Sequence, residues 1–193
     1  MDELEVKEEI RIIKDMIEKT WMFLLVWGIV AILGVIGMYT LVYFGKYSWI
    51  WLNWIVFVVI GVTHTMIYGA KQEQLRGTKT YAQIAAVHLS IACGIAFILV
   101  GFIFPVLGLY SYGLIAVFIS LVAGILIFGM GGIYEWNLLK WCGVIWWSGA
   151  LGMAFIHENF RALLFVPLVL AGYVLPALVL RSMYRKERNK NAS

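Results

Sequence analysis

The stretch WMFLLVWGIVAILGVIGMYTLVYF, which occupies residues 21–44, contains no charged side chain. A helix of about 20 apolar residues is long enough to cross the ~30 Å hydrocarbon core of a membrane. Five more stretches of this kind follow, and the longest connection between them, 71–80, has ten residues. The six predicted spans are 21–44, 49–70, 81–104, 109–130, 136–156 and 160–180.

The composition supports a membrane protein, because 63% of the residues are hydrophobic and only 13% are charged. Strands of a membrane barrel alternate apolar and polar residues, and this sequence does not. Helices satisfy their own backbone groups in lipid. We therefore predict an all-α integral membrane protein with six transmembrane helices. An amphipathic cytoplasmic helix over 1–20 precedes the membrane bundle over 21–180, and a basic cytoplasmic tail over 181–193 follows it.

The Lys and Arg residues are sorted between the two ends of the predicted spans. Two of them, Lys46 and Arg161, lie at one end, and thirteen lie at the other. Cytoplasmic segments carry the excess of basic residues, so the pattern predicts a multi-pass protein of the cell membrane with both termini in the cytoplasm. The net charge of +4 then reflects topology, and no nucleic-acid partner is expected. The thirteen are Lys7, Arg11, Lys14, Lys19, Lys71, Arg76, Lys79, Lys140, Arg181, Arg185, Lys186, Arg188 and Lys190.

The segment before the first span has an apolar stripe made by Val6, Ile10, Ile13 and Ile17, at the spacing of one helix face. This helix could lie flat on the lipid, continue span 1 as a stalk, or fold back over the bundle. Seven acidic residues against four basic ones argue against binding to an anionic leaflet. The stripe is therefore a candidate for docking onto a second copy or a protein partner, with a packing role as the alternative.

Small residues mark helix contacts in lipid because they let backbones approach closely. The clearest such stripe lies in span 4 and predicts a contact within the bundle or between copies. Pro167 and Pro176 predict a kink in span 6. Span 1 and span 5 share a faint similarity that fails in register, and we interpret it as chance. The span 4 stripe comprises Gly113, Ala116, Ser120 and Gly124.

Few polar residues fall inside the spans. His64 and His88 are each predicted to lie ~8–10 Å inside adjacent antiparallel spans, facing the bundle interior. Ionisable groups inside membranes are often functional, so a ligand or proton pocket is one interpretation. A haem or metal site is another, and hydrogen bonding between helices is the structural alternative. The complete set of pocket candidates is His64, His88, Thr63, Thr65, Tyr68 and Glu135.

No phosphate-binding loop, zinc-protease motif, nucleophile elbow or acidic pair is present, so we expect no enzymatic activity. Cys93 and Cys142 sit at different depths inside spans 3 and 5, which argues against a disulfide. No cofactor is expected, apart from the alternative of haem or a metal at the two histidines.

Three functions remain. The first is a non-enzymatic membrane subunit, homo-oligomeric or bound to a membrane or cytoplasmic protein, that acts through helix–helix association. The second is a small-solute or proton-linked transport component with its pocket at His64 and His88. The third is a haem- or metal-binding redox membrane protein.

Overall fold

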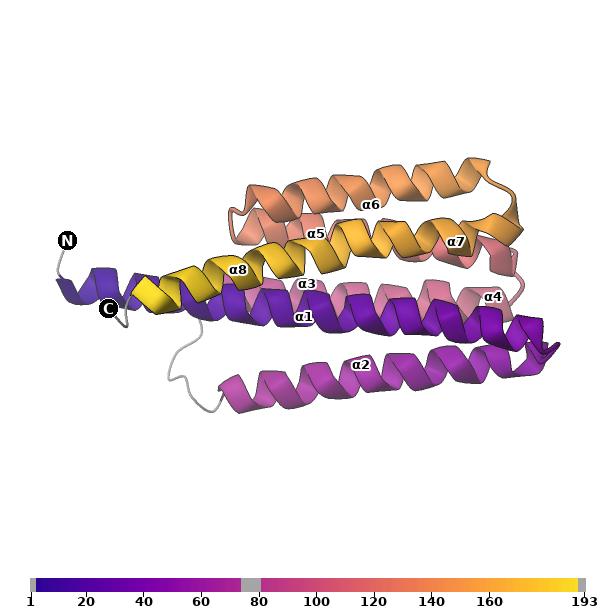
Figure 1. Ribbon diagram of the computed structural model, residues 1–193, viewed down its shortest axis with the longest axis horizontal. Coiled ribbons are helices and arrows are strands. Elements are labelled where there is room, and N and C mark those ends of the chain that lie inside the picture. Colours follow the sequence, from indigo (N-terminus) through magenta and orange to yellow (C-terminus); the bar gives the residue numbers. More distant parts are fainter. Residues whose placement is uncertain (1–2, 74–80, 191–193) are drawn as a thin grey trace. The chain divides into compact units, whose positions relative to one another are not determined.

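The computed structural model describes residues 3–73 and 81–190, and the side chains of residues 20–67, 81–158, 160–183 and 185 among them. Every element in these ranges is helical. The α-helices are α1 (Glu3–Tyr43), α2 (Ile50–Glu73), α3 (Tyr81–Ile98), α4 (Phe104–Val106), α5 (Ile115–Ile133), α6 (Asn137–Phe155), α7 (Glu158–Val169) and α8 (Leu175–Lys190) (Figure 1). Single-turn 3₁₀ helices cover Tyr47–Trp49 and Tyr112–Leu114, and π-helical segments cover Leu99–Ile103 and Leu170–Val174.

Six helical stretches are long and apolar enough to cross a membrane, which confirms the predicted all-helical class and fits a multi-pass protein. They are Thr20–Tyr43, Tyr47–Ile67, Tyr81–Val106, Tyr112–Ile133, Asn137–Phe155 and Phe160–Met183. The predicted start of the fourth stretch at residue 109 is three residues too early. Gly108 has a φ of +71°, a left-handed conformation that glycine adopts without strain, and Ser111 is extended, so the chain turns there before the helix begins.

The N-terminal segment and the first span form one continuous helix, because α1 runs from Glu3 to Tyr43. Of the three arrangements that the sequence allows, this is the stalk. The side chains before Thr20 lie outside the described ones, so the docking role of Val6, Ile10, Ile13 and Ile17 stays a prediction. At the other end of the chain, α8 continues to Lys190, so most of the predicted tail is helical.

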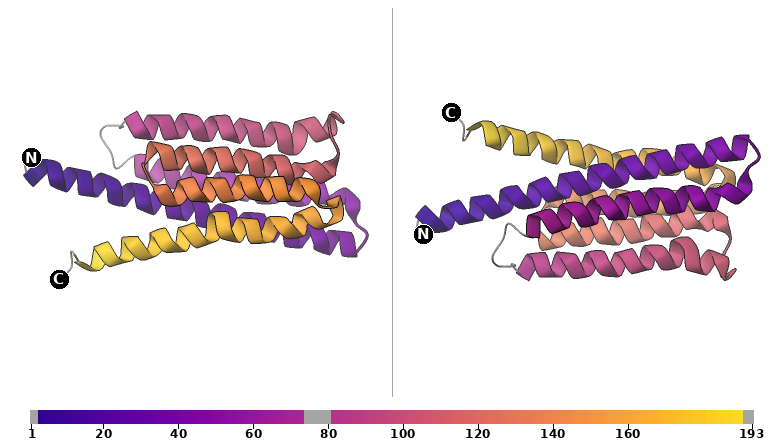
Figure 2. Two further views of the ribbon diagram at one scale, coloured as in Figure 1. Left: turned by 90° about the horizontal axis from the view of Figure 1, so that it is seen from above. Right: turned by 90° about the horizontal axis from the view of Figure 1, so that it is seen from below.

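The chain divides into two compact units. The first comprises Met1–Thr65 and Tyr173–Ser193, and within it α1 packs along α8. Both views of Figure 2 show these two helices separating toward the chain termini. Gly28 lets them approach, since a methyl group built there would lie 2.9 Å from Val174 Cγ2. The Arg181 guanidinium lies 5.4 Å from the centre of the Trp21 ring, a cation–π contact that joins the two helices again.

The second unit, Met66–Gly172, is built around the hairpin of α5 and α6. Glycines let these two backbones touch: a methyl group on Gly143 would lie 2.6 Å from Phe128 Cβ, and one on Gly131 would lie 2.7 Å from the Lys140 nitrogen. Helix α3 packs on α5, and α7 on α6. Trp146 is fully buried, with its ring 5.8 Å from that of Phe165 on α7. Small residues thus give the close approach that lipid-immersed helices need.

Candidate functional site

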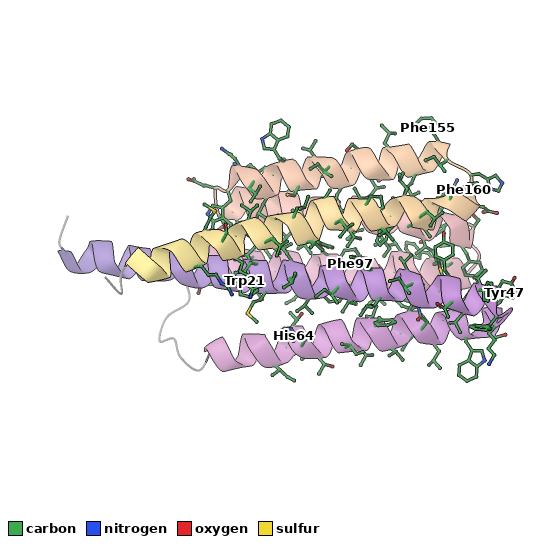
Figure 3. All side chains as sticks on the ribbon, viewed as in Figure 1. Trp21, Tyr47, His64, Phe97, Phe155 and Phe160 are labelled. Carbon is green, nitrogen blue, oxygen red and sulfur yellow. The ribbon has the colours of Figure 1, made fainter. Side chains whose placement is uncertain are left out.

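The polar residues of α2 up to Thr65 belong to the first unit, and Thr65 itself joins α1 to α2. The Trp27 indole N–H donates to Thr65 Oγ1 at 3.2 Å, and the Thr65 hydroxyl donates to the Gly61 carbonyl at 2.8 Å. Thr63 is exposed, and His64, labelled on α2 in Figure 3, is half-buried. The Tyr68 side chain lies outside the described ones. Thr65 therefore has a structural partner that was not predictable from its own helix.

A second polar bridge crosses the same pair of helices. The Asn53 amide N–H donates to the carbonyl oxygen of Gly34 at 2.9 Å. Gly34 has little room for a side chain, because a methyl group there would lie 2.8 Å from the Trp54 ring. An amide within an apolar span was the only sequence signal for this contact. Inside lipid such a hydrogen bond fixes the register of two helices.

His88 lies in the second unit, and its side chain is exposed on α3, so the prediction that it faces the bundle interior is wrong for this residue. Its Nδ1 is 2.8 Å from the Ile84 carbonyl oxygen one turn earlier. A carbonyl can only accept, so Nδ1 carries the hydrogen, and in the neutral ring Nε2 is left as an acceptor. His64 and His88 therefore lie in different units, and their shared pocket stays a prediction.

Glu135 occupies the turn between α5 and α6, where it is exposed. Its φ of 55° is the only left-handed conformation of a non-glycine residue in the described part of the chain. The turn is closed by hydrogen bonds from the Glu135 nitrogen to the Gly132 oxygen at 3.3 Å and from the Trp136 nitrogen to the Gly131 oxygen at 2.9 Å. The local geometry gives Glu135 a place in a tight turn, and its membership of the proposed pocket is untested.

The small residues predicted to form a stripe make two separate contacts, one from α5 and one from the 3₁₀ turn Tyr112–Leu114 before it. Gly124 packs against the Trp147 indole on α6, while Gly113 faces Glu158 Oε2, which would lie 2.6 Å from a methyl group built on the glycine. Ser120 is fully buried and returns its hydroxyl to the Ala116 carbonyl at 2.8 Å. Ala116 itself is half-buried.

Arg161 has a structural role in addition to its place in the charge pattern. Its Nε donates to the carbonyl oxygens of Met153 and Ile156, each at 3.0 Å, and so satisfies acceptors at the C-terminal end of α6. Phe155 and Phe160, labelled in Figure 3, flank this turn and are 84% and 58% exposed.

The strongest irregularities that the sequence did not predict are the two π-helical segments. In the first, the Phe104 N–H bonds to the Leu99 carbonyl, one residue further back than in an α-helix. The next donor in this register would be Pro105, which has no N–H, so the Val100 carbonyl loses its backbone partner. The Tyr110 hydroxyl donates to that carbonyl instead. Burial raises the Tyr110 pKa above its ordinary value.

The second π segment, Leu170–Val174, ends two residues before Pro176. By the same register, Pro176 supplies no N–H for the Ala171 carbonyl. The neighbouring Gly172 lies directly against the Trp146 indole, with no room for a side chain. We call each π segment, together with the proline that follows it, a break. Both breaks contain a glycine, a proline and a carbonyl that lacks its helical donor. Helical turns of the π type are frequent at functional sites.

Among the described side chains, those of residues 20–67, 81–158, 160–183 and 185, no three His, Cys, Asp or Glu form a group able to hold a metal ion. The chain matches no family model, and it has no significant similarity to a curated protein or to a solved structure.

Proposed function

We propose that the protein is a small-solute or proton-linked transport component of the cell membrane. The observation that carries the proposal is the pair of π-helical breaks in the third and sixth apolar stretches, at Leu99–Ile103 and Leu170–Val174. Irregular backbone is costly in lipid and persists where it is covered by protein or faces a path for solute. Transport proteins place such interrupted helices at their substrate sites, because unpaired carbonyls offer polar ligands within the membrane.

The side chains that would line the solute path are the intramembrane polar groups proposed from the sequence. His64 and His88 are the leading candidates, because an imidazole has one nitrogen that donates a hydrogen and one that accepts. The Nε2 atom of His88 is an acceptor while its Nδ1 holds the Ile84 carbonyl. Both termini and the turn at Glu135 would lie on the cytoplasmic side, following the distribution of Lys and Arg.

Thermal unfolding of the purified protein with a panel of solutes tests this proposal. The panel contains amino acids, sugars, quaternary ammonium ions, and monovalent and divalent metal ions. A solute at 100 times its Kd should stabilise the fold by about 2.7 kcal/mol. For a chain of this size that is a rise of about 5–10 °C in Tm.

Pro176→Ala should reduce the ligand effect, because it restores a helical donor at the second break. Leu163→Ala, at a 52% exposed position of the same span, is the matched control and should leave the effect unchanged. The transport proposal fails if no solute changes the Tm and vesicles containing the protein show no proton flux above that of empty vesicles.

A second candidate is a membrane subunit that acts by association with itself or a partner. It is favoured by the sparse burial of the second and third apolar stretches, 6% and 11% of their windows, against 28–44% for the other four. Ala92 on α3 is exposed and small, as a residue at a helix contact would be.

The association candidate has its own test in the apolar stripe of the N-terminal helix. Changing Ile10 and Ile13 to Asp should reduce the size of the assembly in nanodiscs while the spans still insert. Lys14→Asp changes the net charge by the same two units outside the stripe and should have no effect. An unchanged size for the double variant would remove this candidate.

A further inference from the structure

The two π-helical breaks share a sequence. Residues 99–111 read LVGFIFPVLGLYS, and residues 170–182 read LAGYVLPALVLRS. Six of the thirteen positions are identical, including the glycine and the proline of each break, and most of the others exchange similar apolar residues. A proline alone would explain a kink, but it would not explain the shared flanking sequence.

Two more stretches match between the halves of the chain, in the same order. Residues 30–38, VAILGVIGM, align with 122–130, VAGILIFGM, with four of nine positions identical. Residues 47–54, YSWIWLNW, align with 134–141, YEWNLLKW, with four of eight identical. The three matches relate span 1 to span 4, span 2 to span 5 and span 3 to span 6. The loops between them differ in length, and the π segment begins 18 residues after the start of the third stretch but 10 after the start of the sixth, so no single offset reveals the relation.

The local structure agrees with this alignment at two independent points. Helix α2 begins at Ile50, directly after Trp49, and α6 begins at Asn137, directly after the aligned Trp136. The π segments Leu99–Ile103 and Leu170–Val174 cover the same five positions of their aligned sequences. Aligned residues thus share helix starts and the π-helical segments, a type of helix that is rare in proteins.

One packing contact in each unit is reciprocal. In the second unit the third span packs on the fourth, since α3 contacts α5, and a methyl group on Gly101 would lie 3.5 Å from Ile119 Cδ1. In the first unit the sixth span packs on the first, through α8 and α1, at Gly28 and Val174. Gly28 aligns with Ser120, the residue after Ile119. The contact of the third span with the fourth therefore corresponds to the contact of the sixth span with the first when each span is replaced by its aligned partner.

The positions that follow each break correspond as well. Tyr110 aligns with Arg181, and both lie over an aromatic ring of the reciprocal helix. The rings of Tyr110 and Phe118 have centroids 4.6 Å apart, and the Arg181 guanidinium lies 5.4 Å from the centre of the Trp21 ring. The chemistry of the two side chains differs, however. The Tyr110 hydroxyl also donates a hydrogen bond to the Val100 carbonyl, whereas Arg181 carries a charge.

We propose that the chain is an internal duplication of a three-span unit and that its two Gly–Pro breaks are matching bending points. Three spans are an odd number, so the two copies cross the membrane in opposite directions and form an inverted repeat. Matching positions then face opposite sides of the membrane. This further step rests on the transport function proposed above: the breaks at Gly101 and Gly172 are the two gates of the solute path, one for each side of the membrane.

Hydrogen exchange of the full-length protein in nanodiscs, without added solute, tests the equivalence of the breaks. The amides of 99–104 and 170–175 should both exchange faster than those of the neighbouring α-helical turns. Pro105→Ala and Pro176→Ala should each slow exchange in its own segment on the order of fivefold, as expected for one regained backbone hydrogen bond.

A motif exchange adds a test of the shared sequence. Val100→Ala, Phe102→Tyr, Ile103→Val and Phe104→Leu convert the first break into the second. This variant should keep both the fast-exchanging segment and the Tm. The matched control, Phe104→Pro with Pro105→Phe, keeps the composition but moves the proline, and it should lose both.

Rapid exchange in only one of the two segments would overturn the duplication, as would a motif exchange that behaves like the control. These measurements need no solute. A failed solute screen with two fast-exchanging segments would therefore reject transport and the role as gates, and leave the duplication standing.

Discussion

Tyr110 donates its hydroxyl hydrogen to the backbone carbonyl of Val100, the acceptor that Pro105 leaves without a helical donor. A side chain from the turn after the third span thereby completes the hydrogen bonding of a broken helix. This contact explains how a π-helical segment persists near the end of an apolar span. It also distinguishes the first break from the second, where arginine stands at the aligned position.

Tyr110→Phe should destabilise the protein by about 1–3 kcal/mol, because it leaves the Val100 carbonyl without a donor while preserving the ring. The free energy of unfolding in denaturant measures the effect. Tyr81→Phe is the matched control, since Tyr81 is 86% exposed, and it should change stability by less than about 0.5 kcal/mol. Equal stabilities of the two variants would show that the hydrogen bond contributes nothing.

The pH dependence of stability follows from the same residue. Burial raises the pKa of Tyr110 in the folded state above that of the unfolded chain. The unfolded state therefore loses the proton first, so the contribution is fully present below pH about 10 and is lost as the pH rises through the folded pKa. Tyr110→Phe should flatten the loss of stability in this alkaline range. An identical alkaline profile for the parent and the variant would exclude Tyr110 as its source.

Gly124→Leu should destabilise the α5–α6 hairpin by about 1–3 kcal/mol, because the glycine packs directly against the Trp147 indole. Lipid offers no compensating hydrophobic gain for the displaced side chain. Gly132→Ala is the control, since no atom of another residue lies within 4 Å of a methyl group built there. The unfolding midpoints of both variants are measured in the same detergent. A lower midpoint for Gly124→Leu alone indicates a helix contact at Gly124, and equal midpoints indicate that Gly124 faces lipid.

Glu135→Gly should stabilise the protein by about 1 kcal/mol, because it removes the cost of a left-handed backbone at a residue with a side chain. Glu135→Ala retains that cost and should give no such gain. If both variants behave alike in thermal unfolding, the effect belongs to the carboxylate and the backbone argument is wrong.

His64→Ala and His88→Ala should each abolish the stabilisation by the solute identified in the thermal screen, if the two rings form one site. The double variant should then be no worse than either single variant, because residues that act as a unit are not additive. Additive losses of stability with ligand binding intact would instead assign both rings to packing.

The number of long apolar helices and the all-helical class could be predicted from the sequence, because a helix must have a minimum length to cross lipid. The start of the fourth span could not, since Leu109 and Tyr110 are apolar enough to belong to it and only the turn at Gly108 excludes them. The polar contacts of Trp27 with Thr65 and of Asn53 with Gly34 depend on the rotation of one helix against another, which periodicity does not give.

Pro105 and Pro176 mark π-helical segments, whereas the sequence was used to predict only a kink in span 6. Pro105 was assigned to the turn after span 3, yet it lies within helix α4, and the residues before it form a π segment. The comparison of span 1 with span 5 also missed the relation between the halves, because the aligned partner of span 1 is span 4. The repeat has no constant offset, because the loops and the distances from span start to π segment differ between the halves. The shared helix starts and π segments support the alignment of span 1 with span 4.

The inverted orientation of the two halves is tested most directly at their aligned turns, Lys46 before α2 and Glu135 before α6. Single cysteines are placed at these positions in a Cys93→Ala, Cys142→Ala background and treated with a membrane-impermeant maleimide. Lys46→Cys should react in intact cells, and Glu135→Cys should react only after permeabilisation. Reaction of both cysteines in intact cells would place the two turns on one side of the membrane and contradict the inverted repeat.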